Sequence, residues 1–198
     1  MARPKYKESE TPARERIIES FWVLLEAMPH HKITVSAITQ HAKVNRNTFY
    51  YHFETIEDLS ICAVQESMRP DLIGAMIASM AISDTAPSLP FQELGPERRK
   101  IGLVTGNHGS PQLMSILKSR VRNVWCEIVG IQQDNITDVD DLLIEFALSG
   151  MLGVIAPRLA ISDDVEKTFR SLFDTGLPSY LVQQLVDIAK RSCGEASS

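Results

Sequence analysis

The chain has 198 residues, of which 44% are hydrophobic, and a formal net charge of −5 at neutral pH. This length accommodates a small domain and a larger one with a sizeable core. The acidic balance excludes a protein that coats nucleic acid along its whole surface, and no apolar run reaches the roughly 18–20 residues that a membrane span requires. Three cysteines without CxxC spacing (Cys62, Cys126 and Cys193) argue against a zinc site or a disulfide framework. Together with the lack of an N-terminal signal peptide, they predict a cytoplasmic protein.

The predicted architecture has three parts in chain order: a flexible polar arm over residues 1–10, a helix-turn-helix domain over 11–60 and a helical domain over 61–198. The arm is either a solvated tail or a supplementary DNA contact through Arg3, Lys5 and Lys7. No strand pattern, internal repeat or low-complexity tract stands out along the chain. We therefore expect an all-α fold.

The first helix is expected to begin at Thr11, with Pro12 as its first helical residue, and to end at Met28 before Pro29. It carries apolar residues at helical spacing: Ile17, Ile18, Phe21, Trp22, Leu25 and Met28. This stripe should form the core of the small domain.

Two short helices joined by a tight turn are predicted between Thr34 and Phe53. The first has one narrow apolar face, made of Val35, Ile38 and Ala42. Thr34 precedes that face and is placed to cap the free N–H groups of the helix, as Asn45 is for the second helix. Phe49 and Phe53, four residues apart, should bury on one side of the second helix.

The other side of that second helix gathers polar and aromatic residues. Arg46, Asn47, Tyr50 and Tyr51 fall together because positions i, i+1, i+4 and i+5 cluster on a helical wheel. Arginine can fork onto guanine, asparagine can pair with adenine, and tyrosine hydroxyls can reach phosphates. This pattern is typical of a base-reading helix in a helix-turn-helix.

The remaining helices are expected to alternate with proline- and glycine-marked breaks. A fourth helix should run from Thr55 to a break or kink near Pro70, and a Met- and Ala-rich helix over 71–82 should precede a loop over 83–96. Further helices are predicted over 97–104, 111–129, 138–156 (ended by Pro157), 163–173 and 178–191, with a turn over 106–110.

Charge is distributed unevenly along the chain. The window from Ala27 to Phe53 holds no acid, but it holds two lysines, one arginine and four histidines. Residues 1–65 are balanced in charge, so residues 66–198 carry the whole acidic deficit. A surface without acids can approach phosphates without repulsion of like charges, although packing or chance can also produce such a window.

These residues resemble the DNA-binding domain of the tetracycline-repressor (TetR) family of bacterial transcription regulators. The resemblance covers residues 11–65 and is carried by Ile33-Thr34-Val35, Ile38, Ala42-Lys43-Val44, Asp58-Leu59 and above all the hexapeptide Thr48-Phe49-Tyr50-Tyr51-His52-Phe53. A generic helix-turn-helix does not require that hexapeptide. The remainder of the chain agrees with the family only in length and helical character.

Two positions depart from the family pattern. The family usually has glycine where this chain has Lys43, so Lys43 must either accept the steric cost of a left-handed backbone or adopt a different turn. Its side chain either adds a phosphate contact or is a tolerated substitution. Ile56 stands where a lysine commonly touches the DNA backbone, although Thr55 can still cap the next helix and offer its N-terminus to a phosphate.

The resemblance implies that eleven residues contact DNA: Thr34, Ser36, Lys43, Asn45, Arg46, Asn47, Thr48, Tyr50, Tyr51, His52 and Thr55. Thr34 would bind phosphate, and Arg46 and Asn47 would probe bases. The three aromatic residues would meet phosphates or thymine methyl groups, or the ring of Tyr50 packs between helices while its hydroxyl points outward.

Two helices of the second domain suggest a homodimer. Small and apolar residues follow one another at helical spacing in the helix after Asp138: Leu143, Ala147, Gly150 and Val154. The final helix has an apolar surface wider than one core face requires: Leu181, Val182, Leu185, Val186 and Ile188. In similar proteins these helices form a four-helix bundle between subunits; ordinary packing within one chain is the alternative. Two-fold symmetry would also double the surface buried on a palindromic operator.

The resemblance further implies a pocket for a small apolar or amphipathic effector in the second domain. Flexible or aromatic residues that could line it are equally suited to a plain core: Met76, Met80, Phe91, Met114, Trp125 and Phe146. His108, which is expected in an exposed loop, does not indicate a ligand site any better. We therefore assign no ligand-binding residue, no metal and no cofactor.

The favoured function is a dimeric, sequence-specific repressor that binds double-stranded DNA and is released by a small effector. An activator or co-regulator of the same fold that answers to a protein partner is the alternative. An enzyme is disfavoured because the sequence has no nucleophile elbow, no phosphate-cradling glycine loop and no metal-site spacing.

Overall fold

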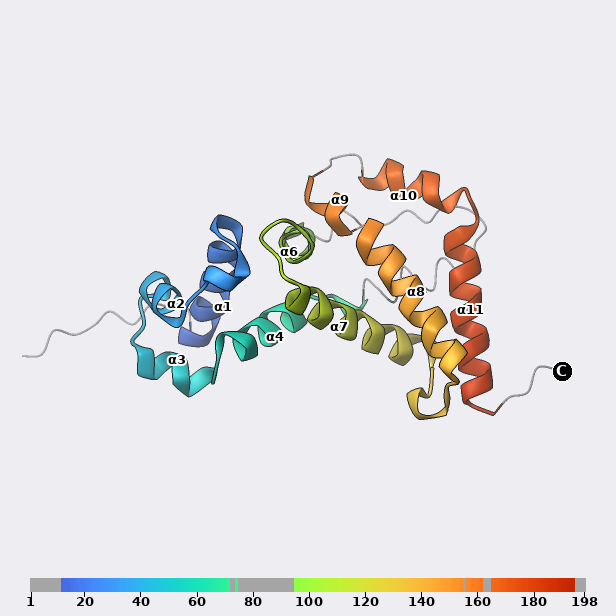
Figure 1. The fold of residues 1–198 in the computed structure, drawn as a ribbon, viewed down its shortest axis with the longest axis horizontal. Coiled ribbons are helices and arrows are strands. Elements are labelled where there is room, and N and C mark those ends of the chain that lie inside the picture. Colours follow the sequence, from blue (N-terminus) through green and yellow to red (C-terminus); the bar gives the residue numbers. More distant parts are fainter. Residues whose placement is uncertain (1–11, 72–73, 75–94, 155, 162–164, 195–198) are drawn as a thin grey trace, which may run out of the picture. The chain divides into compact units, whose positions relative to one another are not determined.

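The computed structural model describes residues 12–71, 74, 95–154, 156–161 and 165–194. Every regular element among these residues is a helix, which confirms the all-α fold (Figure 1). The chain divides into two compact units, Met1–Ala63 and Val64–Ser198. The predicted arm over residues 1–10 lies outside the described residues.

Unit 1 consists of helices α1 (Ala13–Ala27), η1 (His30–Lys32), α2 (Val35–Ala42) and α3 (Arg46–His52), together with the larger part of α4 (Ile56–Glu66). Helix α1 packs against both α2 and α3, and α2 packs against α3. Their buried apolar side chains form one core: Ile17, Ile18, Phe21, Trp22, Leu25, Ile33, Ile38, Ala42, Phe49, Phe53, Leu59 and Ala63. The predicted stripe of α1 is therefore core, apart from its half-buried last member Met28.

Helix α1 is shorter than the sequence predicted. Pro12 precedes the helix as its N-cap, with φ −52° and ψ 146°, and is not its first helical residue. At the other end Met28 is already extended, with φ −152°. Pro29 explains this end, because a proline disfavours helical backbone in the residue before it.

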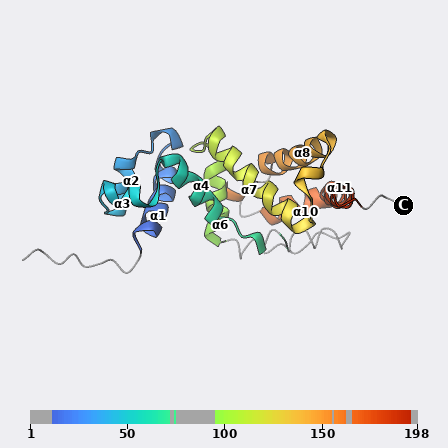
Figure 2. The same cartoon turned by 90° about the horizontal axis from the view of Figure 1, so that it is seen from below.

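Unit 2 contains the last residues of α4 and the helices α6 (Gly95–Thr105), α7 (Pro111–Val129), η2 (Gln133–Asn135), α8 (Asp138–Val154), α9 (Ala156–Ile161), α10 (Val165–Phe173) and α11 (Leu177–Ser192). Helix α8 packs on α7, α9 and α11, and α6 packs on α9. Figure 2 shows α7, α8 and α11 from below. Most of the buried side chains come from α7, α8 and α11: Leu113, Leu117, Val121, Val124, Trp125, Ile144, Leu148, Leu152, Val182, Leu185 and Ile188.

Several predicted boundaries differ from the structure. Helix α8 ends at Val154, and Pro157 does not end it but lies in the first turn of α9, where a missing N–H costs nothing. Helix α4 ends at Glu66, ahead of Pro70. Helix α6 begins at Gly95, inside the predicted loop over 83–96. The rest of that loop and nearly all of the predicted helix over 71–82 lie outside the described residues.

A polar cluster in unit 2 joins the N-terminal end of α8 to the C-terminal end of α11. The Asp140 carboxylate, only 4% exposed, accepts hydrogen bonds from the Thr137 hydroxyl (2.8 Å) and backbone N–H (3.1 Å) and from the Arg191 guanidinium. Burial alone would raise the pKa of Asp140, but the hydrogen bonds from Arg191 and Thr137 outweigh it and hold the pKa below its ordinary value. The cluster fixes the start of α8 against the end of α11.

Within the described part of the chain, no helix combines the length and the apolar character needed to cross a membrane.

Candidate DNA-binding surface

Helix α2 is capped as its sequence predicted. The hydroxyl oxygen of Thr34 accepts a hydrogen bond from the backbone N–H of Ala37 at 3.2 Å. Ile38 and Ala42 are buried while Ser36 is exposed, so the helix turns its apolar side to the core. Thr34 and Ser36 therefore lie at the free N-terminal end of α2, where unpaired backbone N–H groups favour an anion.

The turn between α2 and α3 contains a strained residue. Lys43 has φ 54° and ψ 45°, the left-handed conformation, and is the only non-glycine with positive φ among the described residues. The sequence left open whether Lys43 accepts the steric cost of a left-handed backbone or adopts a different turn. In the structure Lys43 has the left-handed backbone. The N–H of Val44 bonds the Thr39 carbonyl at 3.1 Å, which closes the turn and leaves the Lys43 side chain exposed.

Helix α3 begins with a double cap. The Asn45 side-chain oxygen accepts hydrogen bonds from the backbone N–H of Thr48 at 2.7 Å and from its hydroxyl at 3.0 Å. This cap fixes the first turn of α3, from which Arg46 and Asn47 extend into solvent. The same cap engages the Thr48 hydroxyl, which is half-buried, and leaves the amide NH2 of Asn45 available as a donor.

The two sides of α3 differ as predicted. Phe49 is fully buried and Phe53 is 3% exposed, with their ring centroids 6.0 Å apart. On the other side Tyr50 is 55% and Tyr51 84% exposed. The Tyr50 ring meets Phe49 edge-on at 5.4 Å without being buried between helices, and the half-buried His52 lies edge-on to Tyr51 at 4.9 Å.

Thr55 is less suited to a phosphate than the sequence suggested. Its hydroxyl oxygen accepts the backbone N–H of Asp58 at 3.0 Å, so the predicted cap is present. The Asp58 carboxylate in turn accepts the backbone N–H of Glu54 at 3.1 Å, and Glu57 adds a further acid to the first turn of α4. These two carboxylates already satisfy the positive end of the helix dipole and repel a second anion.

Two of the four histidines in the acid-free window have structural partners that the sequence did not reveal. His30 is 7% exposed, and its Nε2 lies 3.1 Å from the Ser60 hydroxyl oxygen. Burial and the neighbouring His31 lower the pKa of His30, against a smaller opposite effect of Glu57, so the charged form of His30 is disfavoured. His41 lies 2.9 Å, through Nδ1, from the hydroxyl of buried Ser20.

Helices α2 and α3 thus bring ten of the eleven predicted residues onto one connected segment, Thr34–His52, and Thr55 follows at the start of α4. Among the residues that the structure describes, no group of three or more His, Cys, Asp or Glu side chains is arranged to hold a metal ion. Capped α2 and α3, packed on α1 and carrying an acid-free polar face, form a helix-turn-helix DNA-binding domain.

The comparisons with known proteins agree with this class. Residues 17–61 match the family model described as "Bacterial regulatory proteins, tetR family". The family resemblance of the helix-turn-helix domain is confirmed, and this domain makes the chain a DNA-binding transcription regulator. No curated protein sequence matches the chain.

Two solved structures are similar over most of the chain. The TetR family repressor AlkX from Dietzia sp., implicated in biodegradation of n-alkanes, has 16% identity and a TM-score of 0.47, over 89% of this chain and 98% of that one. The dihydroxyacetone kinase operon activator DhaS has 17% identity and a TM-score of 0.48, over 86% and 96% respectively.

Proposed function

We propose that the protein is a repressor that binds a palindromic operator as a homodimer and is released by a small molecule. The observation that supports DNA binding is the solvent-exposed face of α3. Arg46, Asn47, Tyr50 and Tyr51 share it, while Phe49 anchors the opposite side in the core. A helix held so firmly presents its polar side chains in a defined direction, which sequence reading requires.

The residues of this face divide by chemistry. Arg46 and Asn47, in the first turn of α3, would form the bidentate contacts to base edges. Thr34, Ser36 and Lys43 would bind phosphates and fix the register of the domain on the duplex, as would the tyrosine hydroxyls. Asn45, Thr48 and His52 would add flanking contacts, and we rank Thr55 last because of the acids beside it.

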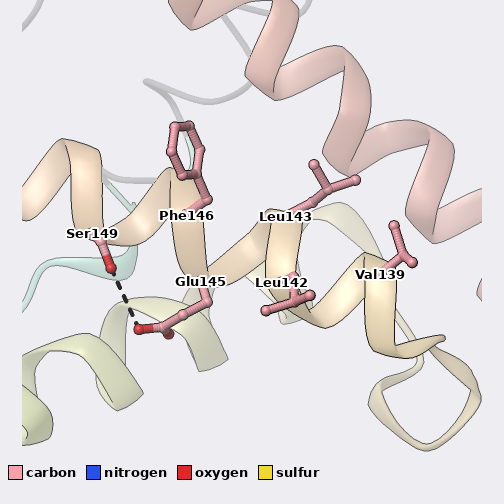
Figure 3. A pocket seen from close by; sticks show the side chains of 6 residues that line it. All are labelled: Val139, Leu142, Leu143, Glu145, Phe146 and Ser149. Carbon is pink, nitrogen blue, oxygen red and sulfur yellow. Dashed lines mark hydrogen bonds between the residues drawn. The ribbon is translucent and has the colours of Figure 1, made fainter.

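Dimerisation would use the outward face of α8. Val139, Leu142 and Phe146 are 65%, 66% and 71% exposed and line an open apolar groove together with Leu143, Glu145 and Ser149 (Figure 3). A Cβ added at Gly150 or Gly153 would meet nothing within 4 Å, so another helix can approach closely there. The face differs from the one that the sequence predicted, because Ala147 is buried in its own unit.

A second copy of this chain suits that groove on electrostatic grounds. The acid that lines it, Glu145, is already paired with Lys118, and the neighbouring Asp141 is paired with Arg122 at 2.6 Å. An isologous contact would therefore bury apolar side chains without adding an unpaired charge. On α11, Val182, Leu185 and Ile188 are buried in the unit's own core, so that helix would contribute its exposed residues, such as Tyr180.

The effector would be held in unit 2. Phe146 is not a candidate for an enclosed effector cavity, because it is exposed and lines the open groove of α8. Met76, Met80 and Phe91 lie outside the described residues. Met114 and Trp125 remain. Met114 is half-buried, whereas Trp125 is 6% exposed and its indole N–H has no hydrogen-bond partner among the described residues. A buried donor without a partner costs free energy that an acceptor oxygen on a ligand would recover.

Selection of bound sequences from a randomised DNA pool tests the proposal. We expect a palindrome to be enriched. Arg46→Ala should cost about 1–3 kcal/mol of discrimination at one base pair in each half-site. Arg46→Lys is the matched control, because it keeps the charge but loses the bidentate fork, so it should retain affinity for DNA in general and lose the base preference. Absence of any enriched sequence at low salt would contradict the proposal.

A further inference from the structure

Helix α4 connects the two units. It runs without interruption from Ile56 to Glu66, and the boundary between the units falls inside it, between Ala63 and Val64. The direction in which α4 leaves unit 1 therefore follows from the contacts that hold its first two turns. Those contacts involve residues that the DNA-binding surface does not use.

Arg14 makes the first of these contacts. From α1, its Nη2 donates to the sulfur of Cys62 in α4 at 2.7 Å. The centre of the same guanidinium lies 5.7 Å from the centroid of the Phe53 ring, within cation–π range. Phe53 directly follows α3 as its C-cap residue. One side chain thus touches both the end of the base-reading helix and the helix that leaves the unit.

A second contact involves Ser60, two residues before Cys62 in α4. The Ser60 hydroxyl donates to the Ile56 carbonyl at 2.7 Å, so its oxygen is the acceptor for the Nε2–H of His30 at 3.1 Å. Both side chains are buried. Because Ser60 and Cys62 are two residues apart, the two contacts hold different sides of α4 and together oppose its rotation.

We propose that Arg14 is a positioning residue that, through Phe53 and Cys62, sets the angle between α4 and α3 and thereby the half-site spacing that the dimer accepts. The proposal rests on the dimeric operator binding proposed above. An 11-residue helix is about 16 Å long, so a tilt of about 10° at one end moves the other by about 3 Å. That displacement is close to the rise of one base pair, about 3.4 Å.

The test compares affinities of the full-length protein for the selected palindrome and for versions with one base pair added to or removed from the centre. For the wild type we expect a steep loss of affinity at the altered spacings. Arg14→Met keeps the stem of the side chain but removes the guanidinium, and it should reduce the ratio between the best and the altered spacings at least threefold. The ratio is informative because a general loss of stability lowers all three affinities together.

Two further variants complete the design. Ser20→Ala is the matched control: it removes a part-buried hydrogen bond between α1 and His41 of α2, and the spacing ratio should stay at the wild-type value. Cys62→Ala should reproduce the effect of Arg14→Met, and the double variant should add little to either. Cys62→Ala also decides the question if Arg14→Met fails to fold.

The outcomes separate the two proposals. If the wild type binds no palindrome, the proposed function fails. If it binds one but Arg14→Met or Cys62→Ala keeps the wild-type spacing ratio, the proposed function stands and the role of Arg14 is refuted. A change of equal size in Ser20→Ala would refute that role as well.

Discussion

Replacing Lys43 by glycine should make the protein more stable and a weaker DNA binder at the same time. Lys43 holds a left-handed backbone at φ 54°, which costs a residue with a Cβ about 1–2 kcal/mol and glycine almost nothing. Part of this gain is offset, since glycine loses more backbone entropy on folding. We expect a net gain of about 1 kcal/mol, or about 2–4 °C in Tm for a chain of this size.

The weaker binding to DNA follows from the loss of the positive charge of Lys43. A dimer that places one Lys43 on a phosphate in each half-site loses two such contacts in Lys43→Gly. The slope of log K against log salt should then become shallower by about 1.8, that is, about 0.9 per contact. Base preference should not change, because phosphate contacts carry no sequence information. Anisotropy titrations between about 50 and 200 mM salt measure the slope, a range over which such contacts matter strongly.

Lys43→Asn separates the two effects, because asparagine tolerates the left-handed conformation and also lacks the charge. It should lose affinity as the glycine variant does, with a smaller gain in stability. An unchanged or lower Tm in Lys43→Gly would refute the argument from backbone strain. An unchanged salt slope would refute the phosphate contact and leave Lys43 as a tolerated substitution.

The other predictions concern the polar cluster of unit 2, the buried histidine and the outward face of α8. Asp140→Asn should lower the free energy of unfolding by about 1–3 kcal/mol in urea titrations at pH 7. The lowered pKa of Asp140 means that this difference is complete above the unfolded value of 3.8 and closes as pH falls through the folded pKa. A difference that began to close already above pH 3.8 would contradict the lowered pKa. The pKa of His30 is lowered from 6.5, so the unfolded chain binds a proton at this residue at a higher pH than the folded chain does. The free energy of unfolding should therefore decline as pH falls below 6.5, and His30→Gln should flatten that decline. Equal slopes in both proteins would refute the lowered pKa of His30. Phe146→Glu should give a monomer in sedimentation experiments, while the control Val23→Glu, at an exposed valine of unit 1, should stay dimeric. A dimeric Phe146→Glu would show that the dimer interface does not include the outward face of α8.

The accurate predictions were those that depend on neighbours in sequence. The caps by Thr34, Asn45 and Thr55 each involve a backbone N–H three residues ahead, so the local pattern contained both partners. The burial of Phe49 and the exposure of Tyr51 followed from helical spacing in the same way. Predictions of helix ends were less accurate where a proline was the signal, since a proline is compatible with the first turn of a new helix as well as with the end of an old one.

The sequence by itself determined that the chain is helical, where the second and third helices begin, and which side of the third helix turns outward. These properties arise within single helices, from spacing and capping over three or four residues. Only the tertiary structure decided that Arg14 meets Cys62, that Asp140 meets Arg191, and that Phe146 lines an open groove on the exposed face of α8. The partners in the first two pairs are 48 and 51 residues apart, and no local pattern encodes which helices meet or at what rotation. Long-range packing sets those pairings, because the burial of a side chain depends on the neighbour that covers it.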